Sequence, residues 1–370
     1  MDFKLIVKKI ENTLTSEEEK EFLDWYQASA RHRQYFDKVE ENLYHGRIKV
    51  NKEKAWKTIN RRPEYNSKKR RGYLRYVSAA AVVLLVALGI ITYRSTGERA
   101  EVKVADIRPG TSRAILTLEN GNEVALREGE VFATGKATSN GRQLVYTADT
   151  GSRDQYNALE VPRGGEFVLR LPDSSRIWIN AGSKIKYPVA FLPGETRTVE
   201  LLYGEAYFQI TPAAKHEGSA FVVKTGSQEI EVLGTEFNIR AYPEDEDITS
   251  TLVEGKVALS GRTSRELLIP GEQVVYTEQD GTMKKKRVNT EDYTSWRAGV
   301  FRFRDITLEE MALTLSRWYD VKVSFTDDAL RTMKFNGSFS RELGLRKILD
   351  VLSASSNVTY KIDENEVKLK

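Results

Sequence analysis

The sequence predicts a multi-domain membrane protein with a small all-α cytoplasmic head, one transmembrane helix, an all-β exported region and a C-terminal α+β domain. Three observations support this fold class: an uncharged apolar run, a long stretch of period-two alternation, and a return to helical spacing near the end of the chain. The expected boundaries are 1–66 for the head, 67–75 for a basic juxtamembrane linker, 76–93 for the span, 100–283 for the β region, 284–298 for a linker and 299–370 for the C-terminal domain.

The apolar run, YVSAAAVVLLVALGIITY, occupies residues 76–93 and contains no charged side chain. At about 1.5 Å per residue a helix of this length measures roughly 27 Å, close to the thickness of a bilayer core. Lysines and arginines gather before the run, so the positive-inside rule places the N-terminus in the cytoplasm. A signal peptide would lie nearer the N-terminus, and a buried soluble helix would show a polar stripe.

Composition limits the possible chemistry of the 370-residue chain. It contains no cysteine, which excludes disulfides and thiolate catalysis. Its net charge of +4 is mild, and the basic excess is concentrated in residues 61–75. Such a run can bind nucleic acid, but beside a span it more often meets anionic lipid. We therefore expect the basic run to contact the inner membrane, and we expect no direct nucleic-acid partner.

Four short helices are predicted in the head. One begins at a capping box formed by Ser16 and Glu19, and a later one ends the head near its basic linker. Four short helices bury little surface, so the head needs a partner to complete its core. Candidate partner-binding residues share an aromatic character: Phe22, Trp25, Tyr26 and Trp56. The alternative is that these aromatics simply pack on one another.

Alternating apolar residues and turn signals such as Asn120-Gly121 predict antiparallel strands across the exported region. An internal repeat is visible at an offset of 53 residues: PGTSRAILTLENGNEVAL, from Pro109, matches PRGGEFVLRLPDSSRIWI, from Pro162. Repeated strand units of this kind suggest a solenoid-like stack or a sandwich.

Five motifs in this region carry a resemblance to a known family. They are VPRGGEFVLRLPDSSRIWINAGSKIKYP, RTVELLYGEAYFQI, FVVKT, IEVLGTEFNIRAYPED and TLVEGKVALS, in order over roughly residues 160–275. Together they resemble the FecR family of single-span inner-membrane sigma-factor regulators. The resemblance implies a periplasmic β region and a regulatory rather than enzymatic role.

The C-terminal domain is predicted to follow the order β-α-β-β-α-β-β. Its first helix starts at a capping box of Thr307 and Glu310, and a hairpin turning at Glu364-Asn365 ends the chain. This pattern resembles the domain that follows the FecR region in many family members, which is similar to the short N-terminal domain of secretins and TonB-dependent receptors.

No conventional active site is predicted, and neither a metal nor a cofactor is expected. The histidines, His32, His45 and His216, fall in separate segments. One catalytic candidate is the Gly234-Thr235 peptide in VLGTEFNI. The threonine hydroxyl could attack the preceding carbonyl and give an ester, and hydrolysis of that ester by water would split the chain, as the resemblance suggests for some family members. The alternative is a tight turn that uses glycine for its backbone freedom.

The resemblance implies an anti-sigma factor or sigma regulator. The head would bind an extracytoplasmic-function sigma factor, and the C-terminal domain would receive the signalling domain of an outer-membrane TonB-dependent receptor, by strand addition at a sheet edge. Release of the head by proteolysis is the expected route, because a single helix transmits a signal poorly. The alternative is a membrane-anchored periplasmic glycan- or envelope-binding protein, with Trp178 and Tyr207 stacking on sugars. A tethered hydrolase would need paired carboxylates that are not evident.

Overall fold

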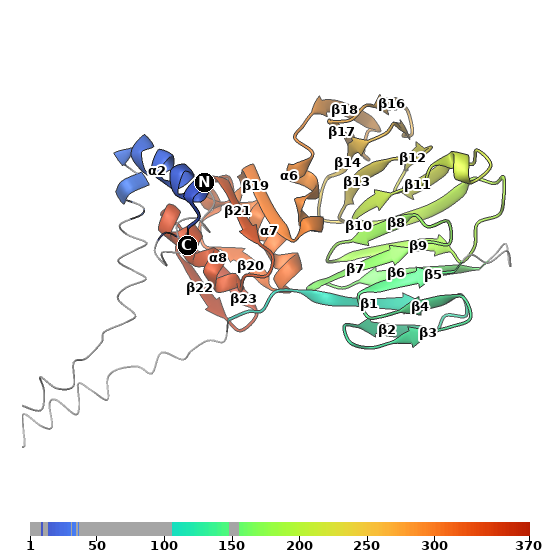
Figure 1. Cartoon of the computed structure of the whole chain (residues 1–370), viewed down its shortest axis with the longest axis horizontal. Helices are drawn as coiled ribbons and strands as arrows, with labels where there is room; N and C mark the ends of the chain where they lie inside the picture. Colours follow the sequence, from blue (N-terminus) through green and yellow to red (C-terminus); the bar gives the residue numbers. More distant parts are fainter. Residues whose placement is uncertain (1–8, 10–13, 31, 35, 37–105, 148–154) are drawn as a thin grey trace, which may run out of the picture. The chain divides into compact units, whose positions relative to one another are not determined.

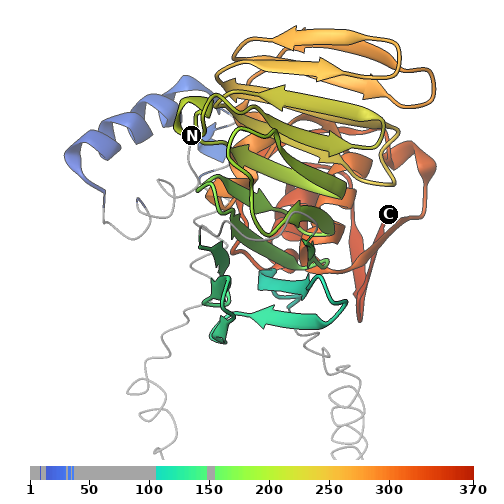
Figure 2. The same cartoon turned by 90° about the vertical axis from the view of Figure 1, so that its right-hand side faces the viewer.

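The computed structural model describes residues 9, 14–30, 32–34, 36, 106–147 and 155–370 (Figure 1). The chain forms two units, Met1–Gly97 and Glu98–Lys370. The second unit contains a large β region followed by a smaller α+β domain, whose elements lie alongside the strands in both views (Figures 1 and 2).

In the first unit, helix α2 spans Ser16–Ala28. Its N-cap is Thr15, whose side chain accepts from the amide of Glu18 while the Glu18 carboxylate reaches back to the Thr15 amide. The capping box therefore begins one residue earlier than the Ser16 box predicted from the sequence. Three glutamates in the first turn suit the positive end of the helix dipole.

The predicted fold class is wrong. The described chain is mostly β, and no helix within the described residues is long and apolar enough to cross a membrane. The longest described helix, α2, has 13 residues and would measure about 20 Å, well short of a bilayer core. The apolar run at 76–93, on which the prediction rested, lies outside the described residues, as does most of the head that was predicted to be all-α.

Eighteen strands of the β region form one continuous hydrogen-bonded network. One layer runs in the order β16-β15-β12-β11-β10-β9-β6-β1-β2, and the other in the order β3-β4-β5-β7-β8-β10-β13-β14-β17-β18. Their bounds are β1 Thr111–Thr117, β2 Glu123–Arg127, β3 Phe132–Ala133, β4 Ala137–Ser139, β5 Gln143–Tyr146, β6 Tyr156–Val161, β7 Gly165–Arg170, β8 Arg176–Ile179, β9 Ser183–Pro188, β10 Arg197–Gln209, β11 Phe221–Thr225, β12 Gln228–Val232, β13 Glu236–Ala241, β14 Asp247–Glu254, β15 Val257–Ser260, β16 Arg265–Leu268, β17 Glu272–Thr277 and β18 Thr282–Arg287.

Strand β10 belongs to both layers. Its first half pairs with β9 and β11, and its second half pairs with β8 and β13, with a register shift between Leu201 and Tyr203. The strand changes layer at Gly204, which has φ +101° and lies so close to Ser183 that a Cβ at residue 204 would collide with it. Glycine is therefore required where the chain crosses between the layers.

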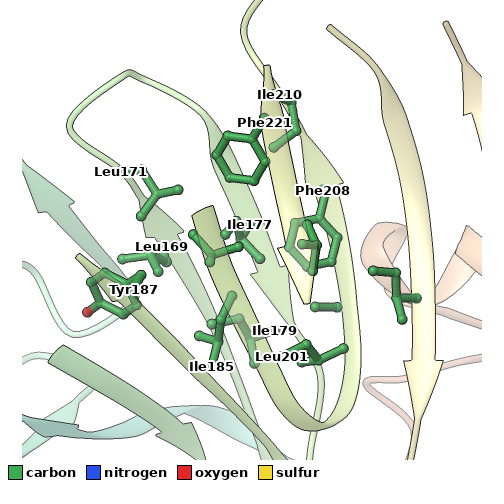
Figure 3. Packing of buried hydrophobic residues seen from close by; sticks show 14 of the residues in the cluster. Leu169, Leu171, Ile177, Ile179, Ile185, Tyr187, Leu201, Phe208, Ile210 and Phe221 are labelled. Carbon is green, nitrogen blue, oxygen red and sulfur yellow. The ribbon is translucent and has the colours of Figure 1, made fainter. Parts of the chain in front are cut away.

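The core of the β region lies between the layers and is built by the alternating side chains of each strand. Figure 3 shows part of it, with Leu169 and Ile177 from β7 and β8 near Ile185 of β9 and Phe208 of β10. The two copies of the sequence repeat form the hairpins β1–β2 and β7–β8, which meet in a short parallel pairing. The repeat therefore encodes one structural unit used twice.

The C-terminal α+β part has two small sheets, β19-β21 and β20-β23-β22, that pack with two helices around a second core. The predicted capping box of Thr307 and Glu310 is confirmed at the start of α7. The bounds are β19 Val300–Thr307, α7 Leu308–Tyr319, β20 Lys322–Phe325, η3 Asp328–Leu330, β21 Lys334–Ser340, α8 Leu345–Ser355, β22 Tyr360–Asp363 and β23 Glu366–Leu369.

Short helical pieces complete the second unit. η1 (Ala213–Lys215) follows β10, while α6 (Glu291–Thr294) and η2 (Ser295–Ala298) connect β18 to β19. The stretch 284–298, predicted as a linker, thus holds the end of β18 and a helical turn whose Trp296 is 9% exposed. β18 is an edge strand, and its basic sequence TMKKKR is a common guard against pairing with other chains.

Candidate protein-interaction sites

The aromatic candidates of the head divide into buried and accessible residues. Phe22 is 2% exposed and packs against Phe36 and Tyr26, with ring centres 5.1 and 5.7 Å away. Trp25 and Tyr26 are half-buried, and Trp25 stacks on His32 at 4.6 Å. The fourth candidate, Trp56, lies outside the described residues. Phe22 therefore lies at the centre of the cluster, while Trp25 and Tyr26 keep part of their surface accessible.

The Gly234-Thr235 peptide lies in the turn before β13. Gly234 has φ +141°, and a Cβ there would lie 2.9 Å from the Cα of Pro212. Thr235 is 4% exposed, and its hydroxyl donates to the carbonyl of Lys256 at 2.9 Å. The backbone demands glycine at residue 234, and the threonine hydroxyl is engaged away from the preceding carbonyl.

A polar cluster missed by the sequence analysis lies under the loop that contains η1. Arg197 and Asp173 form a fully buried ion pair at 2.6 Å, and Arg197 also donates to the hydroxyl of Thr211 at 3.1 Å. The same hydroxyl lies 2.8 Å from Nε2 of His216. Burial, assisted by the charge of Arg197, lowers the pKa of His216. These residues carry no periodic signal that would reveal their proximity.

Trp178 and Tyr207, the aromatics considered for sugar stacking, lie on the outer face of one layer. Tyr207 is 1% exposed, and the guanidinium of Arg297 lies 4.0 Å from its ring centre and 5.1 Å from that of Trp178. A side chain of η2 thus covers both rings. The pair is better described as part of the joint with the C-terminal part than as an open sugar platform.

Buried arginines fasten the C-terminal part to the β region. Arg341 is 3% exposed, and its guanidinium donates to the carbonyl of Trp296 at 2.9 Å and to Oδ1 of Asn180 at 3.1 Å, while stacking on Trp318 at 3.6 Å. Burial lowers the pKa of this guanidinium, with Glu166 at 3.5 Å as its nearby carboxylate.

Two further arginines cross the same joint. Arg317 lies 2.9 Å from Glu244 and 3.4 Å from Asp245, and its guanidinium sits 3.6 Å from the ring centre of Tyr242. From the β region, Arg163 donates to the carbonyl of Ser316 in the last turn of α7 at 2.7 Å and to that of Val321, just after the helix, at 2.9 Å. An open cleft of about 510 Å³ adjoins this second contact.

The C-terminal sheets offer the edges that strand addition requires. In the sheet β20-β23-β22 the outer strands are β20 and β22, and in the pair β19-β21 each strand has one partner strand. Unpaired backbone groups on such edges are templates for an added strand.

The described residues contain no group of three or more His, Cys, Asp or Glu side chains placed to hold a metal ion.

Comparison with known proteins identifies both parts of the second unit. Residues 157–258 match the family described as FecR protein, and residues 300–369 match the family described as FecR, C-terminal. The chain belongs to the FecR family. Both matches agree with the resemblance noted in the sequence.

The fold of this FecR protein is also similar to a solved structure. A candidate anti-sigma factor from Parabacteroides distasonis, with crystal structures at 1.65 and 2.50 Å resolution, is 27% identical to it with a TM-score of 0.52. The similarity covers 58% of this chain and 98% of the other.

Proposed function

We propose that the chain is a sigma-factor regulator in which the N-terminal head binds an extracytoplasmic-function sigma factor. The observation that carries the proposal is the succession of FecR and FecR C-terminal regions on one chain, supported by the likeness to a candidate anti-sigma factor. The half-buried Trp25 and Tyr26 supply the binding surface, because aromatic side chains of this kind dominate protein interfaces.

The test uses the full chain and an extracytoplasmic-function sigma factor from the same genome. Capture of the sigma factor should weaken when Trp25 is replaced by alanine, by about 2 kcal/mol or roughly thirtyfold in Kd if Trp25 is central to the interface. Trp178→Ala is the matched control, because it makes the same change in the β region. Failure of the wild-type chain to bind any sigma factor would exclude the proposal, whereas equal effects of both variants would exclude the assigned surface.

The second part of the proposal concerns the periplasmic partner. The C-terminal part receives the signalling domain of an outer-membrane TonB-dependent receptor by strand addition at β20, β21 or β22, whose edges are open in the described sheets. Amide hydrogen exchange on the full chain should slow along one of these strands when the signalling domain is added. Slowing confined to α7 and α8 would point to a different docking mode.

We also propose that the chain acts at the inner membrane, with its β region on the periplasmic side. Support comes from the FecR family and from the basic excess at residues 61–75. Protease added to intact spheroplasts should digest the β region and leave the head protected. A head and β region digested at equal rates would contradict this arrangement.

A further inference from the structure

The C-terminal part of the second unit holds the segment through which the chain enters the β region. Residues 106–110 precede β1, and in Figure 1 this stretch runs beside the red C-terminal elements before the first strand begins. Nearly 200 residues of sequence separate this entry segment from the domain that contacts it. Such a contact ties the two ends of the second unit together.

Helix α8 makes the first contact. Its N-cap is Gly344, which has no side chain to cap the helix. The amide of Leu345 donates instead to the carbonyl of Ile107 at 3.1 Å, and the amide of Arg346 donates to Oδ1 of Asp106 at 3.1 Å. Asp106 thus caps the helix from a distant part of the same chain, with its negative charge at the positive end of the helix dipole.

The contact leaves no space for a side chain at the cap position. A Cβ on Gly344 would collide with the carboxylate of Asp106. Glycine therefore lets the entry segment approach the helix end, since its backbone conformation (φ −64°) does not itself need glycine. An alanine at 344 would therefore force the Asp106 carboxylate away from the end of the helix.

A second contact lies four residues further along the entry segment. Gly110 lies against Trp318 of α7, and a Cβ there would come within 2.8 Å of the indole ring and of the Gly164 carbonyl. Between Asp106 and Gly110, Ile107 packs against the core of the C-terminal part. The segment is thus held by hydrogen bonds at one end, by apolar packing in the middle and by a close backbone approach at the other.

We infer that the C-terminal part is a clasp that controls protease access to residues 106–110. A protease needs an extended and accessible backbone, so cleavage here requires the clasp to open first. The inference deepens the proposed function, because a partner that binds the C-terminal part can bias the clasp and so regulate release of whatever precedes residue 106. The clasp itself is a property of this chain alone and does not depend on a sigma factor.

The test is limited proteolysis of the purified full chain with thermolysin, which cuts before large aliphatic residues such as Ile107. In the wild type the Asp106–Ile107 bond should resist cleavage, as determined by the intact mass of the fragments. Asp106→Ala removes the cap, and Gly344→Ala displaces it; each should raise the rate of cleavage at Asp106–Ile107 by about fivefold or more. Asp363→Ala is the matched control, since its side chain is 72% exposed and pairs with Lys361 rather than with α8.

Amide hydrogen exchange separates loss of the clasp from loss of fold. The amides of Leu345 and Arg346 should exchange faster in both variants, while those of the last two turns of α8 keep their wild-type rates. Faster exchange at the two amides without faster cleavage would overturn the inference, as would unchanged rates in both measurements. Since neither measurement involves a sigma factor, a negative result would leave the sigma-binding proposal standing.

Discussion

Replacing Arg341 with alanine should loosen the joint between the β region and the C-terminal part. The side chain is 3% exposed and donates to two oxygens, the carbonyl of Trp296 and Oδ1 of Asn180. Both oxygens also accept a backbone N–H, from Gly299 and Ala181, so neither is left without a donor. The cost is therefore the loss of two hydrogen bonds from a charged donor, about 1.5–3 kcal/mol each, and loss of the stacking on Trp318 adds about 1 kcal/mol. Relief of the desolvated charge offsets part of this cost, so we expect a net loss of about 2–4 kcal/mol.

The assay is equilibrium urea unfolding of the full chain, followed by tryptophan fluorescence because Trp296 and Trp318 both lie at the joint. The matched control is Arg331→Ala, an arginine of the same domain. Arg331 is paired with Glu309 and Asp328 but is 38% exposed, so its loss should cost about 1 kcal/mol or less. Equal losses in the two variants would refute the view that Arg341 fastens the joint.

Three further predictions concern other sites. The pKa of His216 is lowered in the folded chain, so the unfolded state binds more protons below about pH 6.5 and the stability of the fold falls as the pH drops. In His216→Asn this part of the pH dependence should disappear when Tm is measured by thermal unfolding at several pH values. An unchanged slope of Tm against pH would contradict the prediction. Gly110→Ala should destabilise by about 1–3 kcal/mol in urea unfolding because its Cβ meets Trp318, whereas Gly135→Ala, with open space around it, should be near neutral; similar costs would contradict the close approach. If the chain cleaves itself at Gly234-Thr235, wild type should run as two fragments on a denaturing gel and Thr235→Ala at full length; two full-length chains would end the hypothesis.

Local patterns in the sequence were sufficient for much of the C-terminal part. Thr307 and Glu310 stand three residues apart before an apolar helical stripe, and the structure has the capping box there. The order of elements from β19 to β23 is the order β-α-β-β-α-β-β expected from the sequence. Signals of this kind work because both partners of each interaction lie within one turn or one hairpin.

The membrane-protein fold class failed for a different reason. It rested on the hydropathy of one window, residues 76–93, which lies outside the described residues, whereas the described residues are mostly strands and contain no helix long and apolar enough to cross a membrane. The capping box of α2 was misplaced by one residue because Thr15 and Ser16 both suit an N-cap and both have a glutamate three residues later. Local chemistry alone does not choose between them.

Long-range polar contacts could not be predicted at all. Asp173 and Arg197 form a buried pair, and Arg341 lies inside the joint, yet a charged residue in a sequence is ordinarily expected at the surface. Nothing near Asp106 indicates that it caps a helix beginning at residue 345. Contacts of this type depend on the finished topology rather than on any local period.

The chemistry of the joint bears on whether a clasp can open. Arg163, Arg317 and Arg341 cross it by donating to carbonyls, an amide oxygen and carboxylates, all of which water can also satisfy. Separating the two surfaces also exposes the buried rings of Tyr242, Trp296 and Trp318, so opening has an apolar cost as well as a polar one. Binding of a partner to the C-terminal part opens the joint only to the extent that the partner binds the open state more tightly than the closed one.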